Sequence, residues 1–149
     1  MKPVITLFAI LLFTIVQAQE NINLKNGYAA EGYDVVAYFN NEAIKGDKNI
    51  TYTYKNVMYS FSSNENLEAF KKNPEMYIPQ YGGYCAYAIA VNNEKVSINP
   101  KSFQILDDKL YLFYDSWGVN TLEKWIDEGP EELLKQANSN WNNLLKKEN

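Results

Sequence analysis

The side chain with the most evident chemistry is Cys85, the only cysteine of the chain, in the segment YGGYCAYA. A thiolate is a soft ligand that suits Cu(I) or Zn²⁺, and a thiol at a helix start is activated because its pKa falls. Gly82 and Gly83 permit a tight bend just before it. The segment predicts a soft-metal ligand or a redox thiol, and a small buried hydrophobe is the third interpretation.

A metal site would need further ligands, because one thiol cannot hold an ion alone. Tyr84 and Tyr87 flank the cysteine, and Asp34 is the acidic residue of the aromatic segment GYDVVAYF. We therefore predict Cys85, Asp34, Tyr84 and Tyr87 as the metal site. Tyrosines gathered in this way are also typical of half-buried packing, in which each hydroxyl reaches a hydrogen-bond partner.

The missing residue types exclude several kinds of chemistry. The chain has no histidine and no arginine, which excludes a histidine-based catalytic triad, a His-ligated zinc site and an arginine clamp on phosphate. A single cysteine excludes an intramolecular disulfide. The net charge of −4 argues against nucleic acid or an anionic membrane as a partner, since both need concentrated basic surface.

The N-terminal segment is typical of a secretory signal peptide over residues 1–18. Lys2 supplies the positive start, an apolar run follows, and Val16 and Ala18 are small residues suited to cleavage after Ala18. An uncleaved anchor is the alternative, although the run is shorter than the ~18–20 residues that span a bilayer. We expect an exported protein, periplasmic or extracellular and free of the membrane after cleavage.

The remaining chain, about 130 residues long, suits one domain with its own core. We expect residues 19–28 to be a flexible lead-in and residues 29–147 to form the domain. Two antiparallel hairpins are predicted, because strand-like segments flank Lys55-Asn56 and Asp107-Asp108. GYDVVAYF fits a strand or a compact turn.

Helices are predicted in three places. Ser62 and Glu65 form a capping box that begins a helix ending before Pro74, which starts a further short turn. Another helix is expected after Gly82-Gly83. Two more close the chain, over 120–128 and 130–147, because apolar residues recur there at helical spacing. The fold class is therefore α+β, with short antiparallel hairpins packed against helices and two helices at the C-terminus.

The order of three segments resembles the YHS domain family in its exported form of roughly 130 residues. These segments are GYDVVAYF, YSFSSNENLEAFKKNPEMY and YGGYCAYA. The resemblance implies an association with heavy-metal handling, including copper. The family's cysteine positions fall on Ala37, Ser62 and Asn66, so metal chemistry retained by this chain would have to use Cys85.

Three classes of function follow from these observations. The leading hypothesis is a small exported binding module that handles copper or another soft metal through Cys85. The second is a thiol-dependent redox protein, which would need an external thiol because no resolving cysteine exists. The third is a non-catalytic structural or protein-interaction domain in which Cys85 only packs. The expected partner is a metal ion or another exported protein.

Overall fold

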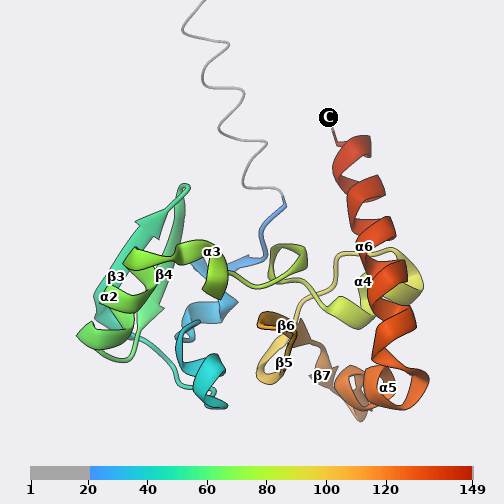
Figure 1. Ribbon diagram of the computed structural model, residues 1–149, viewed down its shortest axis with the longest axis horizontal. Helices are drawn as coiled ribbons and strands as arrows, with labels where there is room; N and C mark the ends of the chain where they lie inside the picture. The colour runs from blue at the N-terminus through green and yellow to red at the C-terminus, as the bar shows by residue number, and fades with distance from the viewer. Residues whose placement is uncertain (1–20, 149) are drawn as a thin grey trace, which may run out of the picture.

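A four-stranded sheet with strand order β1-β2-β4-β3 forms the N-terminal part of the molecule (Figure 1). The computed structural model describes residues 21–148. The strands are β1 (Leu24–Lys25), β2 (Tyr28–Ala29), β3 (Asp47–Tyr54) and β4 (Val57–Phe61). β2 and β4 run parallel, whereas the other neighbouring pairs are antiparallel. Helix α2 (Asn64–Lys72) packs against the β3–β4 hairpin and leads into the short helix α3 (Pro74–Tyr77).

The C-terminal part combines two small hairpins with three helices. The hairpins are β5 (Asn99–Leu106) with β6 (Lys109–Phe113), and β7 (Asp115–Ser116) with β8 (Val119–Asn120). Helix α6 (Pro130–Lys147) packs against α4 (Ala86–Asn92) and α5 (Thr121–Glu128) (Figure 1). Three 3₁₀ turns complete the fold: η1 (Ala30–Gly32), η2 (Ala37–Asn40) and η3 (Tyr81–Gly83). The α+β prediction with two C-terminal helices is confirmed.

Both predicted hairpins are confirmed, and their turns have the expected geometry. Lys55 and Asn56 have φ of 49° and 63°, and Asp107 and Asp108 have φ of 49° and 57°. Two consecutive left-handed residues match the right-handed twist of the flanking strands, which is why two-residue turns of this kind close hairpins. The two C-terminal helices meet at Gly129, whose φ of 100° breaks the helix between them.

The start of α2 differs from the prediction by one residue. Ser63, rather than Ser62, is the N-cap, and its hydroxyl accepts a hydrogen bond from the Asn66 N–H at 3.1 Å. The prediction that Ser62 begins a capping box was wrong because the Ser62 N–H and hydroxyl both donate to Asp34 instead.

The N-terminal residues of the domain also differ from expectation. The expected lead-in, residues 19–28, contributes β1 and the first residue of β2, and Tyr28 pairs with Met58 of β4. Within GYDVVAYF the chain is compact, since the Ala37 N–H donates to the Asp34 carbonyl where η2 begins. The predicted signal peptide, residues 1–18, lies outside the described residues. Within residues 21–148, none of the helices has the length and apolar character that crossing a bilayer requires.

The apolar side chains form two buried clusters. The first lies between the four-stranded sheet, α2 and the β5–β6 hairpin, with Phe70 fully buried among aromatic rings. The second joins α4, α5 and α6 to β6 around the fully buried Trp125, whose indole N–H donates to the Gln104 amide oxygen at 2.9 Å. Packing of large aromatic residues therefore supplies the stability that disulfides give to many small secreted domains.

Burial of tyrosines makes the fold sensitive to alkaline pH. Burial is the main cause that raises the pKa of Tyr38, Tyr59 and Tyr81 well above the usual value of about 10. In the unfolded chain these phenols ionise near pH 10, whereas the folded protein keeps their protons. Stability should therefore be constant below about pH 9 and fall as the pH rises above about 10.

Denaturant unfolding at several pH values, followed together with phenolate absorbance, measures this effect. We expect these three phenols to ionise only as the protein unfolds. Ionisation of every tyrosine near its ordinary pKa, with the free energy of unfolding unchanged, would contradict the prediction.

Candidate functional site

Asp34 is fully buried, and its carboxylate accepts five hydrogen bonds from the protein. Oδ1 accepts from the backbone N–H groups of Val36 and Ala37, at 2.9 and 3.3 Å. Oδ2 accepts from the Ser62 N–H and hydroxyl at 2.8 and 2.6 Å, and from the Asn66 amide at 2.7 Å. These donors occupy the roughly four lone-pair positions of a carboxylate. The carboxylate therefore ties the turn before η2 to the start of α2.

The three donor residues Ala37, Ser62 and Asn66 are the positions that the family resemblance aligns with cysteines. Ala37 is distant in the sequence from Ser62 and Asn66, which lie four positions apart, yet all three meet at one carboxylate. Hydrogen-bond donors thus surround Asp34 where thiols would be needed for a metal site. A metal ion at the Asp34 carboxylate would have to displace hydrogen bonds that these donors now make to its oxygens.

Cys85 lies at the N-cap of α4 and is fully buried. Its backbone N–H donates to the Val96 carbonyl, and its carbonyl accepts from the Ile89 N–H. Its sulfur accepts a hydrogen bond from the Tyr114 N–H at 3.3 Å and lies 3.3 Å from the Thr121 hydroxyl oxygen. Polar groups from β6's end and from α5 therefore contact the thiol.

A further hydrogen bond, made by the Thr121 hydroxyl, decides which atom donates between Cys85 and Thr121. The Thr121 hydroxyl donates to the Tyr114 carbonyl at 2.7 Å, and a hydroxyl has only one proton. The thiol must therefore donate to Thr121 Oγ1. Cys85, Thr121 and Tyr114 form a closed hydrogen-bonded ring in which the thiol is both donor and acceptor.

A small cavity of about 210 Å³ lies beside this hydrogen-bonded ring. Tyr87, Val119 and Lys124 are among the residues that line it together with Cys85. Cys85 belongs to the wall of this cavity, but its exposed fraction is 0%. A reagent in solution therefore reaches the sulfur only after the surrounding side chains move.

The structure places the two predicted tyrosine ligands in different surroundings. The Tyr84 ring packs near Trp141 and carries the Lys95 ammonium 5.9 Å from its centre, and burial raises the pKa of its hydroxyl. The Tyr87 hydroxyl donates to Glu128 at 2.8 Å, and its pKa is raised by burial and by this carboxylate. Raised phenol pKa values disfavour the phenolate that a metal would need.

The four predicted metal ligands share no hydrogen-bond partner. Asp34 is bonded to the turn before η2 and to α2, whereas Cys85 is bonded to Tyr114 and Thr121. Of the other three predicted ligands, only Tyr87 lines the cavity beside Cys85. In the part of the chain that the structure describes, no group of three or more cysteine, aspartate or glutamate side chains is arranged to hold a metal ion.

The hydrogen-bonded ring predicts the effect of Thr121→Val. Valine fills the same space but removes the hydroxyl, so the Cys85 thiol loses its acceptor and the Tyr114 carbonyl loses a donor. We expect the free energy of unfolding to fall by about 1–3 kcal/mol, measured by chemical denaturation. Thr53→Val, at an exposed position of β3, is the matched control and should change stability by at most about 0.5 kcal/mol. Equal effects of the two substitutions would contradict a structural role for the ring.

A larger, open cavity lies elsewhere, at the four-stranded sheet. It has a volume of about 460 Å³ and is lined by residues from β1, β2, η1, β3, β4 and the segment before β3. Its charged members are Lys25, Glu31, Lys45 and Lys48. The remaining lining residues are Asn26, Tyr28, Gly32, Gly46 and Ser60. We call this cavity the lysine pocket.

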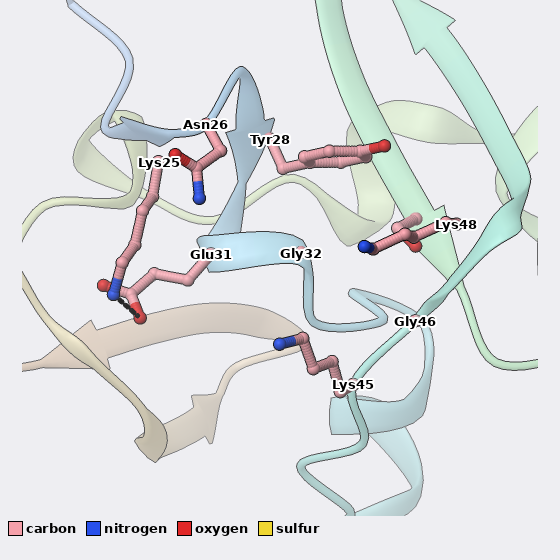
Figure 2. Close-up of a pocket in the computed structure, with 9 residues that line it drawn as sticks. Lys25, Asn26, Tyr28, Glu31, Gly32, Lys45, Gly46 and Lys48 are labelled. Atoms are coloured by element: carbon pink, nitrogen blue, oxygen red, sulfur yellow. Dashed lines mark hydrogen bonds and ion pairs between the residues drawn. The ribbon is translucent and has the colours of Figure 1, made fainter.

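In the lysine pocket, one of the three lysines is paired with the glutamate and the other two are not (Figure 2). Lys25 forms an ion pair with Glu31 at 3.1 Å. Figure 2 shows the ammonium groups of Lys45 and Lys48 pointing toward the chain at Gly32. Neither of these two lysines has a side-chain hydrogen bond or ion pair within residues 21–148. The pocket therefore carries excess positive charge in an acidic protein.

Sequence reasoning did not find the lysine pocket. The Asn26-Gly27 dipeptide is a strong signal for the tight turn between β1 and β2, and it was available in the sequence. The approach of this turn to Lys45 and Lys48 depends on the parallel pairing of β2 with β4. No local pattern predicts that pairing.

Comparison with known proteins gave no match to the chain, whether with protein-family models, curated protein sequences or solved structures. The resemblance to the YHS domain family therefore stays a prediction.

Proposed function

We propose that the protein is an exported, non-catalytic binding module whose ligand site is the lysine pocket. The observation that carries this proposal is the contrast between free and engaged polar groups. Lys45 and Lys48 line an open cavity of about 460 Å³ with no partner among the described residues. The Asp34 carboxylate and the Cys85 thiol, which the sequence favoured as ligands, are instead bonded within the fold.

The cavity has the size of a small-molecule site, since such pockets usually enclose about 300–1,000 Å³. It lies on strands and a 3₁₀ turn whose backbones are fixed by the sheet. For example, the Gly46 N–H donates to the Gly32 carbonyl at 2.8 Å and joins two sides of the cavity. On rigid backbone, the loss of conformational entropy on binding is confined mainly to the side chains, above all the two lysines.

The thiol redox hypothesis has less support. A redox cysteine reacts as the thiolate and must be reached by its substrate. Cys85 is fully buried, and its proton is engaged with Thr121. Handling of a soft metal would likewise require the thiol to leave the hydrogen-bonded ring, because the metal binds the deprotonated sulfur.

Two titrations of the ¹⁵N-labelled protein, followed by NMR, test the proposal. In the first, a panel of acidic, neutral and basic small molecules is added, and shifts should concentrate on residues 25–32 and 45–48. In the second, Cu(I) is added anaerobically to the wild type and to Cys85→Ser, and both should take up the metal weakly and equally. Stoichiometric Cu(I) uptake that Cys85→Ser abolishes would favour soft-metal handling and overturn the proposal. Absence of any response at the lysine pocket would also overturn it.

A further inference from the structure

We infer that the lysine pocket binds small molecules that carry two or more negative charges, such as dicarboxylates or phosphate. This inference rests on the proposed function and names its class of ligand. Three lysines and one glutamate line the cavity, and the glutamate already neutralises Lys25. Lys45 and Lys48 remain as two uncompensated charges, so a ligand with two negative charges would balance them.

The two free lysines both line the cavity. Lys45 precedes β3, and Lys48 is the second residue of that strand. Their side chains lie on two sides of the chain at Gly32 (Figure 2). The nearest acidic side chain in the sequence, Asp47, does not line the cavity, and its Oδ1 accepts the Asn49 N–H at 2.8 Å. Its charge lies next to Lys48 in the sequence and lowers the positive potential there.

The neutral groups of the cavity suit a polar ligand. The Asn26 amide and the Tyr28 hydroxyl can both donate hydrogen bonds. The Ser60 hydroxyl already donates to the Asp47 carbonyl at 2.9 Å, so it can only accept. Lysine binds anions as a point charge without the fixed fork of arginine. The pocket should therefore select for charge and size, and carboxylate and phosphate share the chemistry that it recognises.

A cluster of unpaired positive charge in a protein of net charge −4 raises the local concentration of anions. Both lysines are exposed, so salt screens their attraction, with a Debye length of about 8 Å at physiological ionic strength. We therefore expect the affinity for a dianion to fall as salt is added. The affinity for a monoanion should fall less over the same range of salt.

The test is an NMR titration at low ionic strength with four probes: succinate, inorganic phosphate, acetate and the dication putrescine. Succinate or phosphate should shift the amides of residues 25–32 and 45–48 with a lower Kd than acetate, and putrescine should not bind there. Lys45→Gln and Lys48→Gln should each raise the dianion Kd about two- to fivefold, and the double variant about tenfold. Lys72→Gln, at an exposed lysine of α2 outside the cavity, should leave the Kd unchanged.

The outcomes separate this inference from the proposed function. A preference for succinate over phosphate, or the reverse, identifies the source of the negative charge, and either supports the inference. Equal affinity for acetate and the dianions would overturn it. Binding of only a neutral or cationic molecule in the pocket would overturn the inference while leaving the proposed function intact. Failure of every probe to perturb the pocket would overturn both.

Discussion

Asp34→Asn should lower the free energy of unfolding by about 3–5 kcal/mol, because it breaks a buried network around a charged group. The asparagine amide keeps one oxygen for the Val36 and Ala37 N–H groups. Its NH₂ group, however, would face the donors of Ser62 and Asn66 that now bind Oδ2. In either orientation of the amide, buried donors lose their acceptor, and the turn before η2 would separate from α2.

Chemical denaturation of Asp34→Asn measures this loss. Asp108→Asn is the matched control, since it makes the same chemical change in the exposed turn between β5 and β6. Asparagine tolerates the left-handed φ of 57° at that position, so its stability should stay within about 0.5 kcal/mol of the wild type. A similar small effect of Asp34→Asn would show that the carboxylate does not organise the fold.

Phe70→Ala should lower the free energy of unfolding by a similar amount, about 3–5 kcal/mol. Phe70 lies on α2, is fully buried, and fixes that helix to the sheet. Five aromatic rings surround it at centroid distances of 4.7 to 6.4 Å: Tyr52, Tyr54, Tyr59, Phe61 and Tyr77. Rings from β3, β4 and α3 cannot all move into the space left by alanine, so a cavity should remain.

Trp117→Ala provides the comparison for Phe70→Ala. Trp117 is also a large aromatic residue, but it is 95% exposed at the turn between β7 and β8. Its removal should change the free energy of unfolding by at most about 0.5 kcal/mol. Equal losses for the two variants, measured by denaturant unfolding, would contradict the assignment of Phe70 to the centre of the first core cluster.

The parts of the fold that were predictable from sequence are those specified locally. The turns at Lys55-Asn56 and Asp107-Asp108 join adjacent strands, so the residues that set the register lie next to each other. The break at Gly129 likewise sits between two segments with clear helical periodicity. In each case the signal and the structure that it specifies lie in one short, continuous stretch of the chain.

The parts that were not predictable depend on contacts between distant residues. Ser62 has the sequence of a cap, but the buried Asp34 carboxylate takes both of its donors from 28 positions away. The strands β1 and β2 are too short to show a period, and they exist because β2 pairs with β4. The composition singled out Cys85 as a candidate ligand or redox thiol because it is the only cysteine. Its role depends on Tyr114 and Thr121, which no local pattern links to it.

The functional consequence is a different proposed location for the binding site. The sequence favoured the Cys85 thiol and the Asp34 carboxylate as ligands, and the fold uses both for its own hydrogen bonds. The lysines are common residues at exposed positions, and only their approach across the sheet edge distinguishes them. The proposed binding site therefore rests on unengaged polar groups beside an open cavity and not on an unusual residue type.

The rate at which a thiol reagent such as Ellman's reagent modifies Cys85 in the folded protein tests most directly whether this thiol is structural. With the sulfur fully buried and held by Thr121 and Tyr114, reaction requires opening of the fold. We expect the folded protein to react about a thousandfold or more slowly than the protein unfolded in guanidinium. The rate should rise in Thr121→Val, which weakens the ring. Modification of the folded wild type as fast as the unfolded chain would contradict a structural thiol and restore Cys85 as a site of binding or redox chemistry.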